Sequence, residues 1–169
     1  MKRKRELTKF EKFQEAVKDF FGNFRFGIDF WALGLFGILM LPTIVWWCYS
    51  PAHDVLRTFS TTAMDVFAYI FQAITIALLV FVVRKDGNTR SIDYKSIFFL
   101  FGILSLVLYY AAWVYYFCAW VNIAVMLFMA VFPCTALGCF AALRKNWLAF
   151  LPLILFFALH LSSTFINYV

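Results

Sequence analysis

The chain has 169 residues, of which 64% are hydrophobic and only 14% are charged, and its formal net charge is +6. Its mean hydropathy of +0.83 is far above that of an ordinary soluble domain, whose surface cannot hide so much apolar area. This composition excludes a soluble globular protein and indicates an integral membrane protein.

Long stretches without a charged side chain mark the membrane segments. No Asp, Glu, Lys or Arg occurs between Asp29 and Asp54, between Asp65 and Arg84, between Lys95 and Arg144, or after Lys145. A helix needs roughly 20 apolar residues to cross a hydrocarbon core of about 30 Å, so the third gap is too long for one span. We therefore expect this gap to fold back near residues 117–122, with Pro133 as the less favoured break point.

The sequence predicts an all-α integral membrane protein with five transmembrane helices preceded by an N-terminal amphipathic helix. The predicted spans are residues 29–49, 63–83, 96–116, 121–143 and 147–167, and together they form one bundle over residues 27–169. A helix needs no partner strand to satisfy its backbone inside lipid, which favours this class.

Residues 1–26 form the separate basic segment. Their apolar side chains, mostly Phe, recur at three- and four-residue spacing, while Lys and Glu occupy the positions between them. We expect this helix to lie in the cytoplasmic headgroup layer, where anionic lipid attracts it. The alternatives are a simple topology anchor, or docking onto a partner or a cytoplasmic loop.

The positions of Lys and Arg predict the orientation, because positive loops are retained in the cytoplasm. Fourteen of the fifteen basic residues share one side of the predicted topology, and only Arg57 falls on the other. We expect a plasma (inner) membrane protein with its N-terminus in the cytoplasm and its C-terminus outside. Acidic residues within the basic segment and the lack of an Ala-x-Ala site argue against a cleaved signal peptide.

Polar side chains inside the spans are the best functional signal, because they are costly in lipid and face the bundle interior or a wet cavity. They follow helical spacing in the second span, at Asp65, Tyr69, Gln72 and Thr75, and in the fifth, at His160, Ser163, Thr164 and Asn167. The predicted topology places both sets at similar depth. We predict that Asp65 and His160 approach each other across an outward-facing pocket, lined also by Tyr69, Gln72, Asn122, Ser163, Trp46 and Trp47. The alternative is a set of interhelical hydrogen bonds, each contributing roughly 0.6 to 2 kcal/mol, with no ligand.

Motifs for catalysis or cofactor binding are absent from the sequence. The chain has no phosphate-binding loop, no His-Glu-x-x-His and no Gly-x-Ser-x-Gly, and its four Cys and two His lack metal-ligand spacing. We therefore expect no cofactor, no metal site and no catalytic residues, so that an enzyme is the least favoured class. Whether Cys48 and Cys118 form a disulfide is left undecided at this point, because the sequence does not give the distance and orientation of the two side chains.

We expect the protein to bind or carry a small polar or cationic molecule, or a lipid, through this pocket, with a carboxylate and aromatic walls as recognition groups. The alternative is a non-catalytic structural or regulatory subunit of a larger membrane complex, because no internal repeat of the transporter kind is visible. The expected partners are the bilayer and a homo-oligomer or larger complex. The positive charge reflects topology and anionic lipid, and we expect no nucleic acid partner.

Overall fold

The structure, a computed structural model, describes residues 21–49, 62–85 and 91–168. Five of its helices are long and apolar enough to cross a membrane. They are α2 (Phe30–Cys48), α3 (Thr62–Phe81), α4 (Ile97–Phe117), α5 (Ile123–Leu143) and α6 (Phe150–Tyr168), the last preceded by the short 3-10 helix η1 (Trp147–Ala149). With η1 counted as part of the last span, the bounds differ from the predicted ones by at most two residues. The chain is therefore an all-α protein of the multi-pass membrane type.

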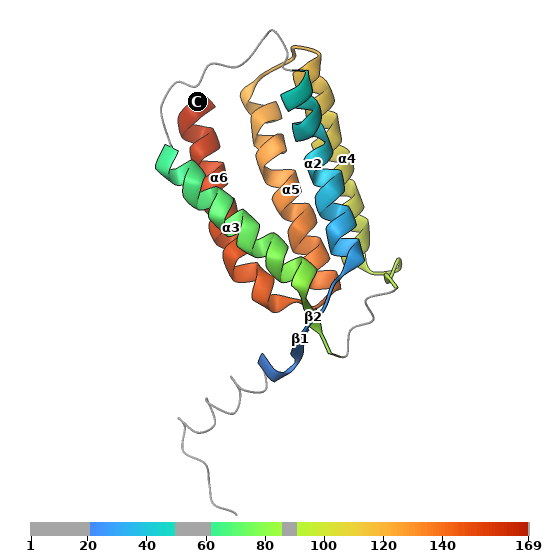
Figure 1. The fold of residues 1–169 in the computed structure, drawn as a ribbon. Helices are drawn as coiled ribbons and strands as arrows, with labels where there is room; N and C mark the ends of the chain where they lie inside the picture. The colour runs from blue at the N-terminus through green and yellow to red at the C-terminus, as the bar shows by residue number, and fades with distance from the viewer. Residues whose placement is uncertain (1–20, 50–61, 86–90, 169) are drawn as a thin grey trace, which may run out of the picture.

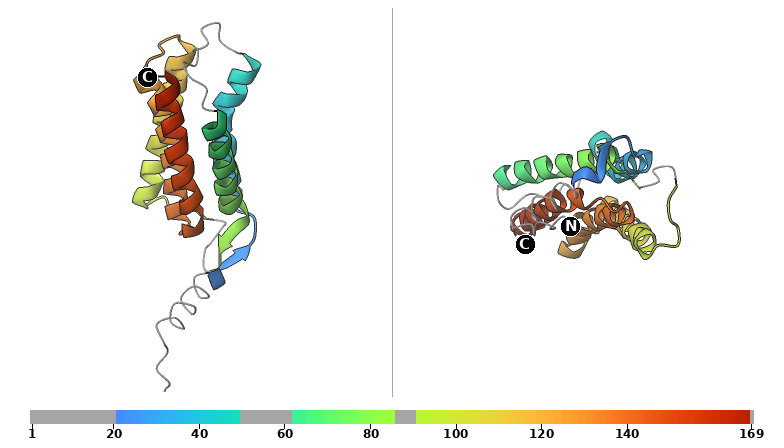
Figure 2. Two further views of the ribbon diagram at one scale, coloured as in Figure 1. Left: turned by 90° about the vertical axis from the view of Figure 1, so that its left-hand side faces the viewer. Right: turned by 90° about the horizontal axis from the view of Figure 1, so that it is seen from below.

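The five helices form two layers (Figures 1 and 2). Helices α2 and α3 lie in one layer, and α4, α5 and α6 lie side by side in the other. Across the layers α2 faces α4, and α3 faces α6. The basic residues Arg84, Lys85, Arg144 and Lys145 lie near one end of the bundle, which we call the basic end; the end that holds Cys48 and Cys118 is the far end.

Two tight links join the helices of the second layer. After α4, Trp120 N donates to the Tyr115 carbonyl at 3.0 Å and Ala119 N to the Tyr116 carbonyl at 3.1 Å, with Ala119 in the left-handed region at φ 63°. After α5, Asn146 N and Lys145 N make the same pair of bonds to Ala141 and Ala142, and Lys145 has φ 53°. This pattern is the Schellman motif, which satisfies the last carbonyls of a helix and reverses the chain at once. The fold-back predicted near residues 117–122 is confirmed.

A two-stranded antiparallel sheet closes the basic end of the first layer. Strand β1 (Phe24–Phe26) pairs with β2 (Val82–Arg84), with Arg25 opposite Val83. Gly27 N and Asp29 N continue this contact by donating to the Phe81 and Val80 carbonyls at 3.0 and 2.8 Å. The sheet was not predicted, because three-residue strands are too short to show a period.

The predicted amphipathic helix over residues 1–26 falls mostly outside the described residues. Phe21 and Gly22 are helical, but Phe24–Phe26 form β1 instead of continuing a helix. The reason is the partner strand: the chain leaving α3 offers backbone groups at this level, and pairing with them satisfies both segments.

Two tyrosines attach α2 to α4. Tyr110 Oη donates to the Ile38 carbonyl at 2.6 Å, and Tyr109 Oη donates to the Leu39 carbonyl at 3.0 Å. The first bond has a specific cause, since the Ile38 carbonyl would normally accept from the N–H of residue 42. Residue 42 is a proline and has no N–H. The Tyr110 hydroxyl therefore replaces the helical bond that Pro42 removes.

We expect Tyr110→Phe to lower the free energy of unfolding by about 1 kcal/mol in the wild-type chain and by almost nothing in a Pro42→Ala background. Alanine restores the N–H that satisfies the Ile38 carbonyl, so the hydroxyl is no longer needed there. Unfolding of the purified protein in mixed micelles measures both values. Tyr115→Phe is the matched control, because Tyr115 is 48% exposed. An equal loss in both backgrounds would show that the two residues are not coupled.

Candidate functional site

A cavity of about 590 Å³ lies between the two helix layers. All five long helices line it, with α2 and α3 on one side and α4, α5 and α6 on the other. Its volume falls in the range of about 300 to 1,000 Å³ that is typical of small-molecule sites. The cavity is therefore the candidate functional site.

A chain of hydrogen bonds lies where α3 and α6 meet at the cavity. The Asn167 side-chain amide donates to Ser163 Oγ at 3.1 Å, and the Ser163 hydroxyl donates to the Asp65 carboxylate. Ser163 and Asn167 are almost fully buried, at 4% and 2% exposure. The carboxylate thus receives an oriented hydroxyl from the opposite helix layer, and the three groups form a polar cluster, which we call the Asp65 cluster.

His160 lies one turn below this cluster on α6. Its ring stacks on Phe156 with centroids 5.2 Å apart, and its side chain lines the same cavity as Asp65. Thr164 does not extend the Asp65 cluster, because its hydroxyl donates back to the His160 carbonyl at 2.9 Å. The cavity wall therefore offers a carboxylate and an imidazole from facing helices.

Seven of the eight predicted site residues line this one cavity. They are Trp46 and Trp47 of α2, Asp65, Tyr69 and Gln72 of α3, and His160 and Ser163 of α6. Trp47 and Tyr69 are 73% and 59% exposed, so they lie at its edge. The two polar helix faces do come together, and both the interhelical hydrogen bond and the open space beside it are present.

Asn122, the eighth residue, is not part of the cavity wall. Its side chain caps α5 by accepting a hydrogen bond from Val125 N at 3.0 Å. Asn122 was predicted to line the pocket from its depth in the membrane alone, and depth does not tell toward which side of the bundle a side chain points. An Asn directly before an apolar helix is a common N-cap residue, and that local role accounts for it.

Helices α4 and α5 supply lining residues that the sequence analysis did not assign to the pocket. They include Tyr109, Trp113, Met126, Met129 and Pro133. The indole N–H groups of Trp46 and Trp113 are buried, and neither meets hydrogen-bond geometry with an acceptor among the described residues. Apolar lining residues carry no spacing signal in a span that is apolar all round, so only the packed helices reveal them.

Two further features of the described residues concern metal ligands and disulfides. The described residues hold no group of three His, Cys, Asp or Glu side chains that could bind a metal ion. All four cysteines, including the exposed Cys48 and Cys118, are free thiols. The lining residues of the cavity can supply charge, hydrogen bonds and aromatic faces.

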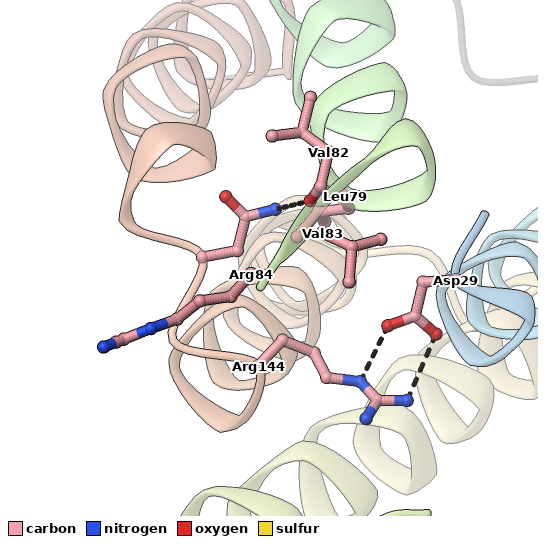
Figure 3. Close-up of a pocket in the computed structure, with 7 residues that line it drawn as sticks. Asp29, Leu79, Val82, Val83, Arg84 and Arg144 are labelled. Carbon is pink, nitrogen blue, oxygen red and sulfur yellow. Dashed lines mark hydrogen bonds and ion pairs between the residues drawn. The ribbon is translucent and has the colours of Figure 1, made fainter. Parts of the chain in front are cut away.

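A second, much smaller pocket of about 20 Å³ lies at the basic end (Figure 3). The Arg144 guanidinium faces the Asp29 carboxylate there, with Nε to Oδ2 at 2.8 Å and Nη2 to Oδ1 at 3.1 Å. Asp29 also caps α2 by accepting from Trp31 N at 3.0 Å and Ala32 N at 3.3 Å. The partner of Asp29 is thus Arg144, a basic residue of the link after α5.

Next to this ion pair, Asn146 holds the end of α3. Its side-chain amide donates to the Leu78 carbonyl at 2.9 Å and to the Val82 carbonyl at 2.8 Å. A pocket of this size has room for little more than one water molecule. The basic-end pocket is therefore a structural junction and not a ligand site.

Comparison with protein-family models, with curated proteins and with solved structures gives no match. The cavity between the two helix layers is therefore the basis for inferring a function.

Proposed function

We propose that this multi-pass membrane protein binds or carries a small polar or cationic molecule, or a lipid, in the cavity between its two helix layers. One observation carries the proposal. A cavity of about 590 Å³ is lined by all five helices and bordered by the Asp65 cluster. Close packing is the rule in protein interiors, so a space of this size among apolar helices is a built feature of the fold.

The polar groups around the cavity suit recognition. The Asp65 carboxylate attracts a positive or hydrogen-bond-donating group, and the aromatic rings of Trp46, Trp47 and Tyr69 offer faces on which a cation is stabilised. Titratable His160 lies in the same wall, so proton uptake can accompany binding. The low dielectric of the bundle strengthens each of these interactions relative to water.

The proposal also includes the orientation of the protein in the membrane. Basic residues gather at the end that the positive-inside rule assigns to the cytoplasm, and the Asp65 cluster lies toward the opposite end. The ligand therefore enters from the outer face of the plasma (inner) membrane or from its outer leaflet. In this orientation the Lys and Arg side chains before residue 21 favour anionic lipid on the inner face.

Binding is tested on the full chain, gently purified and examined by native mass spectrometry for a retained small molecule. We expect Asp65→Asn and His160→Gln each to weaken retention by roughly tenfold or more, because a hydrogen bond to a charged group contributes about 1.5 to 3 kcal/mol. Asparagine still accepts from Ser163, so the fold is kept. Asp93→Asn is the matched control, since Asp93 is exposed and does not line the cavity.

The outcomes of this experiment distinguish ligand binding from a purely structural role of the polar side chains and from a role as a subunit of a larger complex. Lower thermal stability of Asp65→Asn with unchanged retention would mean that the Asp65 cluster serves only to join α3 and α6. Co-purification of another protein, with no small molecule in any preparation, would favour a structural or regulatory subunit of a larger membrane complex.

A further inference from the structure

The lining residues extend far down the bundle. They cover residues 36–47 of α2, 65–76 of α3, 126–137 of α5 and 156–167 of α6, which is eleven residue steps on each helix. At about 1.5 Å per residue this corresponds to a depth of roughly 16 Å. The cavity therefore reaches about halfway through a hydrocarbon core of about 30 Å.

Polarity changes along this depth. The deep end, toward the middle of the helices, is lined by Phe36, Ile76, Leu137 and Phe156, which are all apolar. The polar lining residues lie above them, toward the far end, and the Asp65 cluster lies at the top on both α3 and α6. Helix α5 contributes only apolar residues over the whole depth.

We infer that the ligand is a single-chain amphiphile whose polar head lies at the Asp65 cluster and whose alkyl tail fills the deep apolar end; this inference rests on the proposed function. A small polar molecule would occupy only the upper part and would leave the deep end as a dry void without contacts. A lipid with two acyl chains is larger than the drug-sized ligands that cavities of this volume hold.

The surrounding side chains fit a tail of this kind. Met126 and Met129 line the α5 side, and flexible thioethers adapt to an alkyl chain in more than one conformation. The bilayer is itself apolar, so leaving lipid for the cavity brings the tail no hydrophobic gain. The head therefore decides whether the molecule binds, and the depth of the cavity decides which chain length fits.

This division predicts a measurable signature. Simple partition into a bilayer becomes stronger with each added methylene, whereas a cavity with a floor has an optimum chain length. Raising the floor must shift that optimum to shorter chains without changing the preference for the head. Ile76 of α3 and Leu137 of α5 line the deep end of the cavity, and we call them the floor residues. A phenylalanine ring at either position is larger than the native side chain and extends into the cavity.

The test uses the full chain in lipid nanodiscs and a set of primary alkylammonium probes, namely ethylammonium and a series from octyl to hexadecyl. Bound probe is counted by native mass spectrometry. We expect an optimum chain length in the wild type. In Leu137→Phe and in Ile76→Phe the optimum moves to a shorter probe, and the wild-type optimum probe binds roughly tenfold more weakly, as when a pocket rejects one extra methylene. Leu151→Phe leaves the series unchanged, because Leu151 is 69% exposed and does not line the cavity.

Three outcomes would overturn the inference. Affinity that rises steadily with chain length in the wild type and in the floor variants would mean partition into the bilayer. Binding of ethylammonium as strong as that of the dodecyl probe would mean a small polar ligand, and the proposed function would stand without the tail. Failure of every probe, together with the absence of any retained molecule, would remove the proposed function as well. The two floor variants lie on different helices, so that a folding defect in one leaves the other to decide.

Discussion

Asp29→Asn is expected to lower the free energy of unfolding by about 3 kcal/mol, the lower end of the range for breaking a buried ion pair. Asp29 is 3% exposed, and its carboxylate makes a two-point contact with the Arg144 guanidinium. The substitution leaves a positive charge in the bundle without its carboxylate. The loss stays at the lower end because Arg144 is 13% exposed and also donates to the Ser91 carbonyl at 2.9 Å.

Asparagine is chosen because it separates two roles of the same side chain. Its side-chain oxygen still caps α2, so the loss reports the ion pair, whereas Asp29→Ala removes the cap as well and costs about 1 kcal/mol more. Unfolding in mixed micelles measures both. Lys145→Ala is the control, because Lys145 is an exposed basic residue next to Arg144. Adding Arg144→Gln to Asp29→Asn should recover part of the loss, since no buried charge is then left. A single Asp29→Asn variant as stable as Lys145→Ala would contradict this account.

The second large effect is expected at Asn146, which is 2% exposed. Asn146→Ala should cost about 2 to 4 kcal/mol, because it removes two part-buried hydrogen bonds and leaves two carbonyls, one in the last turn of α3 and one in β2, with fewer donors. Those carbonyls belong to Leu78 and Val82. A helix end without partners is especially unfavourable in a protein surrounded by lipid.

An isosteric variant makes this test sharper. Asn146→Asp keeps the shape of the side chain but replaces the donating amide with an oxygen that faces two carbonyl oxygens. It should therefore be less stable than Asn146→Ala, although it is the smaller change in volume. The comparison uses the same unfolding measurement for both variants. The opposite order, with the alanine variant less stable, would mean that packing and not hydrogen bonding determines the role of Asn146.

The five spans could be predicted because a single physical requirement determines them. A membrane segment must be long and apolar, and the chain meets that requirement between its charged residues. Even the link between α4 and α5 could be located, although no charge marks it. The left-handed residues that close the links, Ala119 and Lys145, could not be predicted, since neither is a glycine or an asparagine.

The candidate site could be predicted as far as helical spacing reaches. Asp65, Tyr69 and Gln72 lie on one face of α3, and His160 and Ser163 lie on one face of α6, so that two lining walls followed from the sequence. The spacing of polar residues shows which of them share one face of a helix, but it does not show which helices are neighbours in the bundle. For this reason Asn122 was assigned to the pocket and Trp113 was not.

The ion pair between Asp29 and Arg144 can form only late in synthesis. The two residues are 115 positions apart, and a ribosome adding roughly 5 to 20 residues per second needs on the order of ten seconds to make that distance. Of the five described spans, α2 is made first. Its partners follow in chain order: Val82–Arg84 pairs with the preceding strand β1, Tyr109 and Tyr110 bond to α2, and Arg144 pairs with Asp29. Until Tyr109 and Tyr110 are made, the strand pairing and the backbone bonds of Gly27 and Asp29 hold the start of α2 beside the end of α3.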